Sequence, residues 1–94
     1  MRRAAKVDRN QSEIVEALRK FGASVQSLAA VGDGVPDLLV GWRGMNLLIE
    51  VKDGSKPPSV RKLTPDQEAW HDAWAGRPVF VVTCVDQVLK ILKP

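Results

Sequence analysis

Three charged side chains flank two short apolar runs near the middle of the sequence. Asp37 precedes the run at 38–40, and Glu50 and Lys52 close the run at 47–49. Carboxylates from neighbouring strands supply the oxygen ligands that Mg²⁺ prefers. An ammonium beside them could orient an attacking water or offset charge that develops on a phosphate. These residue types therefore predict metal-dependent phosphoryl chemistry, provided that the fold brings them together.

The alternative interpretation of the same residues is a salt-bridged pair of strand ends. Side chains alternate along a strand, so Glu50 and Lys52 share one face and Val51 points to the other. A lone Glu-x-Lys occurs often by chance. The longer pattern favours chemistry, because Pro36-Asp37 follows a glycine-rich turn and an apolar run leads into the second motif. Charges at the end of a buried hairpin are also costly unless they bind something.

Length and composition limit the class of protein. The chain has 94 residues, of which 45% are hydrophobic and 27% charged, and its formal net charge is +3. These values indicate one globular domain over residues 1–94, compatible with nucleic acid but not diagnostic of it. The sequence shows no membrane-span pattern or signal peptide, and Cys84 is its single cysteine. We therefore expect a cytoplasmic protein without disulfides or a Cys-based zinc site.

The first helix is expected at about 9–21, and its inward face matters for the site. Its apolar stripe comprises four residues: Ile14, Ala17, Leu18 and Phe21. At about 100° per residue, Asn10 and Gln11 fall on the same buried stripe, whereas Glu13 lies on the flank. The polar groups that this helix aims inward are therefore amides rather than carboxylates.

The remaining elements follow from turn and capping signals. The expected elements, in chain order, are a basic arm at 1–7, an N-cap at Asp8, a strand at 23–29, a hairpin over 35–52 that turns at 41–44, a helix from Pro65 to about Ala75, a strand at 79–83, and a helix that Asp86 caps and that ends at about Leu92. The order α-β-β-β-α-β-α predicts an α/β fold, with a mixed sheet flanked by helices. Because the strand at 79–83 is apolar on both faces, we expect it to be central or doubly covered.

At these motifs the chain resembles the PD-(D/E)XK nuclease superfamily, and most closely the small VRR-NUC proteins of phages and the archaeal Holliday-junction resolvases. The resemblance rests on Pro36-Asp37, Glu50-Val51-Lys52 and the Leu-Thr-Pro-Asp-Gln helix start at 63–67. It implies a restriction-endonuclease-like core and a phosphodiester hydrolase that uses Mg²⁺ or Mn²⁺. Carried over, Asp37 and Glu50 are metal ligands, Val51 belongs to the metal site and Lys52 is the catalytic lysine.

Two glutamines complete the expected catalytic set. Many relatives place a glutamate on the first helix, pointing into the site; here Gln11 has that direction. Its amide could hold an ion or a water without adding negative charge, so we expect one firmly held ion. Gln67 could reach the site, as a glutamine does in VRR-NUC relatives, or it could complete a capping box with Thr64. One side chain is not expected to do both easily.

The tryptophans and the single histidine are further candidates. Trp42, in the hairpin turn, is expected to be exposed and available to DNA or a partner subunit. Trp70 and Trp74 are interpreted as core or dimer-interface residues rather than as platforms for base stacking. His71 has no ligand partner at metal spacing and is interpreted as a surface residue of its helix.

Polar loop residues could also contact DNA. The loop after the catalytic lysine carries three cations, which either are solvated or meet phosphates beside the cut: Lys56, Arg61 and Lys62. Asp33, in a Gly-Asp-Gly turn, either serves turn geometry or helps to position substrate.

Taken together, these features predict an endonuclease that acts on branched or duplex DNA, such as a Holliday junction, as a homodimer. Two-fold symmetry would present two sites of matched polarity. The alternative is a catalytically weak or inactive DNA-binding or assembly module, which Gln11 in place of a carboxylate favours. A nuclease recruited by a helicase or another DNA-processing protein is a third possibility.

Overall fold

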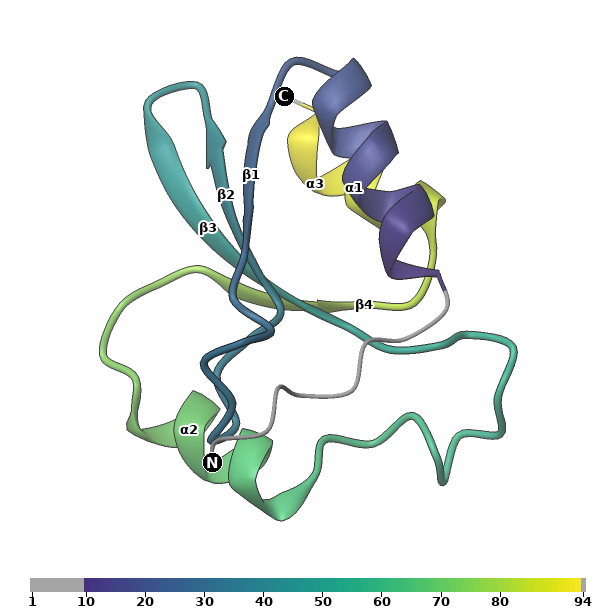
Figure 1. The fold of residues 1–94 in the computed structure, drawn as a ribbon, viewed down its shortest axis with the longest axis vertical. Helices are drawn as coiled ribbons and strands as arrows, with labels where there is room; N and C mark the ends of the chain where they lie inside the picture. The colour runs from purple at the N-terminus through teal and green to yellow at the C-terminus, as the bar shows by residue number, and fades with distance from the viewer. Residues whose placement is uncertain (1–9, 94) are drawn as a thin grey trace.

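The computed structural model describes residues 10–93, which form three helices and one four-stranded sheet (Figure 1). The elements in chain order are α1 (Gln11–Lys20), β1 (Ser24–Ser27), β2 (Leu38–Trp42), β3 (Met45–Val51), α2 (Pro65–Ala73), β4 (Val79–Val82) and α3 (Val85–Leu92). The predicted order α-β-β-β-α-β-α is therefore confirmed. The basic arm at 1–7, the Asp8 cap and the helix start at residue 9 lie outside the described residues and stay predictions.

The sheet has the strand order β1-β2-β3-β4. The first three strands are antiparallel, and β4 runs parallel to β3, so the sheet is mixed as predicted. The expected central position of the last strand is wrong, because β4 lies at the edge. Its Val82 is buried in the core, but Val81 on the other face is 46% exposed. An apolar strand can thus lie at the edge of a sheet with only one of its faces fully buried.

The hairpin between β2 and β3 is tighter than the four-residue turn that the sequence suggested. Trp42 pairs with Met45, leaving Arg43 and Gly44 as a two-residue turn. Both turn residues have positive φ, 47° and 78°, as a type I′ turn requires. This turn matches the twist of the flanking strands, so both strands extend further than their apolar runs indicated.

The hydrophobic core lies between one face of the sheet and the helix pair α1 and α3, which lie side by side (Figure 1). The buried apolar residues are Ile14, Leu18, Ala23, Leu38, Val40, Leu47, Ile49, Val51, Val82, Val88 and Leu92. Because neighbours alternate along β3, Glu50 points to the opposite face from Ile49 and Val51. α2 reaches that second face at Glu50, through the side chains of Gln67 and His71.

Smaller differences concern the helix ends. α1 carries a good buried stripe, but Phe21 is 41% exposed and packs against Trp42 instead of entering the core. α2 ends at Ala73, two residues earlier than predicted, and α3 begins at Val85, so Asp86 lies in its first turn. Among the described helices, none is both long and apolar enough to cross a membrane.

Candidate active site

The two strands of the hairpin bring Asp37 and Glu50 together on the face of the sheet opposite the core. The register pairs Leu38 with Ile49. The next pair along the two strands is Asp37 and Glu50. Both carboxylates are buried. The Asp37 Oδ2 atom accepts a hydrogen bond of 2.7 Å from the backbone N–H of Val51. This bond fixes the Asp37 side chain against the strand that carries the second motif.

Glu50 has polar neighbours on both its own strand and α2. The Gln67 Nε2 atom donates to Glu50 Oε2 at 3.3 Å, and Lys52 Nζ lies 3.9 Å from the same oxygen. Lys52 is itself buried, with its side chain on the same face as Glu50, as strand alternation predicted. A cation and an amide donor thus stabilise a carboxylate that is almost fully removed from water.

Gln67 connects the start of α2 to these charged residues. Its Oε1 atom accepts from the Thr64 backbone N–H at 2.9 Å, and the Thr64 hydroxyl accepts from the Gln67 backbone N–H at 3.2 Å. This reciprocal pair is a complete capping box. The same Oε1 accepts from Lys52 Nζ at 2.5 Å. Gln67 therefore completes the capping box and also reaches Lys52, because an amide oxygen has two lone pairs.

The glycine-rich turn before β2 lets α2 approach the hairpin. Gly34 has φ of +81°, and a Cβ atom there would lie 2.3 Å from the Asp66 carbonyl oxygen. Only glycine combines this left-handed conformation with so close an approach of two backbones. The turn therefore supports the first turn of α2, and through it the position of Gln67.

These residues line one cavity of about 310 Å³. Its walls come from the turn at 32–35, the strand ends and the start of α2, and its polar lining includes Asp33, Asp37, Glu50, Lys52 and Gln67. The oxygen donors fit a hard divalent cation such as Mg²⁺ or Mn²⁺, which binds one or two carboxylates and completes its shell with waters. Within residues 10–93, no cluster of three or more His, Cys, Asp or Glu could hold a metal. An ion here would therefore depend on amide, backbone or water oxygens as well.

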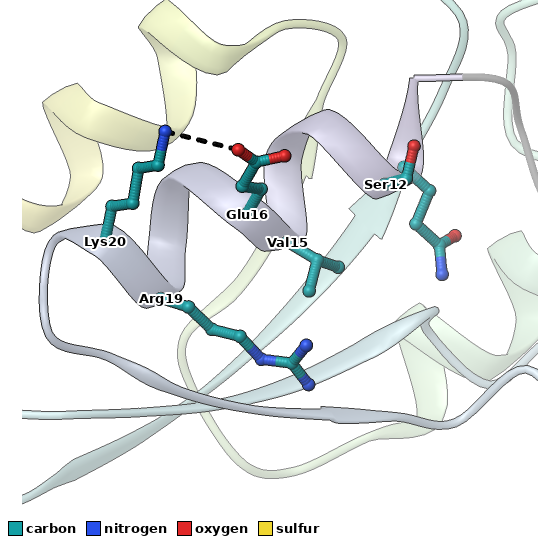
Figure 2. A pocket seen from close by; sticks show the side chains of 6 residues that line it. Ser12, Val15, Glu16, Arg19 and Lys20 are labelled. Carbon is teal, nitrogen blue, oxygen red and sulfur yellow. Dashed lines mark ion pairs between the residues drawn. The ribbon is translucent and has the colours of Figure 1, made fainter.

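Gln11 lies elsewhere. It is buried at the start of α1, as the helical period predicted, and its Oε1 atom has no hydrogen-bond partner among the described residues. It lines a separate cavity of about 690 Å³ along α1, with Ser12, Val15, Glu16, Arg19 and Lys20 (Figure 2). The structure thus brings Gln67, but not Gln11, into the cavity that holds the charged motif.

Asn10, next to Gln11, contacts the backbone of the motif directly. Its Nδ2 atom donates to the carbonyl oxygens of Lys52, at 3.1 Å, and Thr83, at 2.8 Å. One amide thereby joins the start of α1 to the ends of β3 and β4. The sequence placed Asn10 on the inward face but gave no indication of these partners, since they lie 42 and 73 residues away.

His71 is the residue that sequence reasoning missed. The sequence favours a surface position for His71, but its Nε2 atom lies 4.0 Å from Glu50 Oε1, and its side chain is 13% exposed. Burial lowers the pKa of His71, Asp72 opposes that effect, and Lys52 adds to it. A signal was present in the sequence, because residues four apart share a helix face and Gln67 already points to the site.

The remaining candidates fall into different places. Trp42, expected to be exposed, is half-buried against the core, and its indole N–H donates to the Leu92 carbonyl oxygen at 3.1 Å. Trp70 and Trp74 stack on each other with ring centroids 4.6 Å apart, and Trp74 is 50% exposed. Neither belongs to the core, so the core interpretation of this pair is wrong; the dimer interpretation stays a prediction.

The cations of the loop after β3 are placed differently from one another. Lys56 and Lys62 are exposed, whereas Arg61 is half-buried. Asp33 has a φ of 57°, which fits turn geometry, and it also lines the 310 Å³ cavity. Its two suggested roles are therefore compatible.

The chain is similar to a solved structure described as a VRR_NUC domain. The two chains are 35% identical, the match covers 94% of this chain and 95% of the other, and the TM-score is 0.67. No family model matches the sequence, and no curated protein gives a significant match.

Proposed function

Because this chain belongs to the VRR-NUC family, we propose that it is a metal-dependent nuclease that hydrolyses phosphodiester bonds in DNA. A fold alone does not establish an activity, so the proposal rests on the site. The observation that carries it is the convergence of Asp37, Glu50, Lys52 and Gln67 on one cavity. Two carboxylates, a buried ammonium and an amide are the groups that phosphoryl transfer by a nuclease needs.

Mg²⁺ or Mn²⁺ fits this donor set. Asp37 and Glu50 would hold the ion through their carboxylates, and Val51, whose side chain lies in the core, would contribute its backbone carbonyl oxygen. The bound ion would polarise the phosphate and lower the pKa of water. The sequence predicts that Gln11 holds the ion or a water, but Gln11 lines the separate cavity along α1, so no ligand role is proposed for it here.

Lys52 is proposed to act on the phosphate and the attacking water. Gln67 holds the Nζ atom by a 2.5 Å hydrogen bond, and Glu50 lies 3.9 Å away. An ammonium has three donors, so the hydrogen bond to Gln67 leaves N–H groups for a phosphate oxygen or for the water. Held in this way, Lys52 would stabilise negative charge in the transition state without having to reorganise.

The experiment is cleavage of a synthetic four-way junction, a linear duplex and a single strand, each with Mg²⁺, Mn²⁺ or EDTA. We expect metal-dependent cleavage that Lys52→Met and Asp37→Asn reduce by about 10²-fold or more. Lys20→Met is the matched control, because its side chain is 77% exposed and pairs with Glu16 on α1. Wild-type activity in Lys52→Met or Asp37→Asn would contradict the assignment.

We further propose that the enzyme prefers branched DNA and acts as a homodimer. One small domain offers one site, whereas a two-fold dimer offers two sites for strands of opposite polarity. Binding should rely on phosphates and weaken steeply with salt. Sedimentation with and without a junction tests the stoichiometry, and faster cleavage of a linear duplex than of a junction would contradict the preference.

The second candidate function is a DNA-binding or assembly module with a nuclease fold. It is favoured by Gln11, which adds no charge, and by the absence of a three-residue metal cluster among residues 10–93. Junction binding without cleavage at any metal concentration would support it. If cleavage then appears on addition of a helicase or another DNA-processing protein, recruitment is the correct interpretation.

A further inference from the structure

Helix α2 presents two side chains, one turn apart, to the two oxygens of a single carboxylate. Gln67 Nε2 donates to Glu50 Oε2 at 3.3 Å, and His71 Nε2 lies 4.0 Å from Glu50 Oε1. Residues at i and i+4 lie above each other on a helix, so this pair follows from the helical period alone. Glu50 is thereby covered by one rigid element rather than by a loop.

The surroundings of His71 leave its Nε2 atom directed at Glu50. The side chains are 13% and 2% exposed, respectively. The Nε2 atom is buried and has no hydrogen-bond partner among the residues that the structure describes. A buried polar atom is costly when it makes no hydrogen bond, so a small rotation that brings Nε2 into range of Oε1 is favourable.

We propose that His71 is a positioning residue, whose Nε2–H donates to Glu50 Oε1 and fixes the rotation of that carboxylate in the working site. The inference rests on the proposed function, because it concerns Glu50 as a metal ligand. A carboxylate oxygen can accept a hydrogen bond and still bind an ion, since it has two lone pairs. Helix α2 thus orients Glu50 through two side chains, Gln67 and His71.

The expected consequence concerns metal affinity. Groups that orient a metal ligand typically change affinity or activity by about 10–100-fold when they are replaced. His71 itself is proposed to touch neither the ion nor the phosphate. Its loss should therefore weaken Mn²⁺ binding, and cleavage at low Mn²⁺, more than cleavage at saturating Mn²⁺.

The test compares His71→Gln with His71→Asn. A glutamine amide nitrogen occupies about the position of imidazole Nε2, whereas the shorter asparagine cannot reach it; both variants stay polar. Mn²⁺ affinity is measured by calorimetry on the DNA-free protein, and cleavage is measured as a function of Mn²⁺. Thermal unfolding without metal shows whether both variants are folded. Glu68→Gln, exposed on the same helix, is the control.

We expect near-wild-type Mn²⁺ affinity for His71→Gln and about 10–100-fold weaker affinity for His71→Asn. Equal affinities in the two variants, whether both unchanged or both reduced, would overturn the inference while the nuclease assignment stands. If the wild-type protein neither binds Mn²⁺ nor cleaves DNA, the proposed function itself fails. Should His71→Asn not fold, His71→Leu provides the variant without a donor for the same comparison.

Discussion

The Oε1 atom of Gln67 accepts a hydrogen bond of 2.5 Å from Lys52 Nζ while it also accepts one of 2.9 Å from the Thr64 backbone N–H. One amide oxygen is therefore shared between the first turn of α2 and the buried ammonium of the hairpin. Part of what holds Lys52 in place therefore comes from that helix start. The capping box, usually a matter of stability alone, is here a condition for the geometry of the site.

Replacing Gln67 should therefore cost both stability and activity. In Gln67→Leu, loss of the side-chain cap is expected to lower the unfolding free energy by about 1 kcal/mol. The loss of the contacts to Lys52 and Glu50 should reduce cleavage by about 10²-fold, because catalytic groups tolerate little misplacement. Urea unfolding and single-turnover cleavage measure the two effects.

Gln87→Leu is the matched control for that prediction. Gln87 Oε1 accepts from the Thr83 backbone N–H at 2.6 Å, a similar contact at the start of α3. Gln87 does not line the 310 Å³ cavity. Its replacement should lower stability by about the same amount, 1 kcal/mol, and leave cleavage unchanged. An equal loss of activity in both variants would refute the shared role of Gln67.

Replacing Gly34, in the turn before β2, should lower both stability and cleavage. Gly34→Ala would place Cβ 2.3 Å from the Asp66 carbonyl oxygen at a φ of +81°. The left-handed conformation costs about 1–2 kcal/mol and the forced shift of α2 about 1–3 kcal/mol more. Displacement of α2 should also reduce cleavage. The two effects are measured by chemical unfolding and by DNA cleavage.

Gly44→Ala separates backbone strain from the close approach. Gly44 has a similar φ, +78°, but nothing lies within 4 Å of its added Cβ. Only the conformational cost of about 1–2 kcal/mol is expected there, with cleavage retained. Similar losses in both variants would mean that the contact between the turn and α2 is unimportant.

The hairpin and its charges could be predicted because their signals are local. Strand alternation predicts Glu50 and Lys52 on one face. The register that sets Asp37 opposite Glu50 comes from the two-residue turn, which is shorter than the turn that the sequence suggested. The capping box of Thr64 and Gln67 was also readable, since its partners are three residues apart. Each of these features depends on spacing within one element or across one turn.

The remaining features depend on tertiary packing. Asn10 finds its partners across the sheet, and nothing near Asn10 in the sequence indicates Lys52 or Thr83. The edge position of β4 was missed, because an apolar strand does not reveal how much of each face is covered. His71 is different: its helical spacing from Gln67 was visible, but a lone histidine without a metal partner was interpreted as a surface residue.

Trp42 is predicted to contribute to stability rather than to DNA binding. Trp42→Phe removes the hydrogen bond from its indole N–H to the Leu92 carbonyl oxygen, which should cost about 1 kcal/mol of unfolding free energy. Junction affinity, measured by fluorescence anisotropy, should not change. Trp74→Phe, at a position that is 50% exposed, should affect stability less. A weakened affinity in Trp42→Phe at unchanged stability would restore the original interpretation of Trp42 as a DNA contact.

The environment of His71 predicts how stability without metal depends on pH. Burial lowers the pKa of His71 below its ordinary value of 6.5, so near and below that pH the unfolded chain binds more protons than the folded one. This contribution to stability is complete above about pH 6.5 and is lost as the pH falls toward the folded-state pKa. His71→Gln, which does not titrate, should therefore lose less stability than wild type between pH 7.5 and pH 5.5, as measured by urea midpoints. Carboxylates titrate in both proteins, so parallel declines would show that His71 is not held in its neutral form.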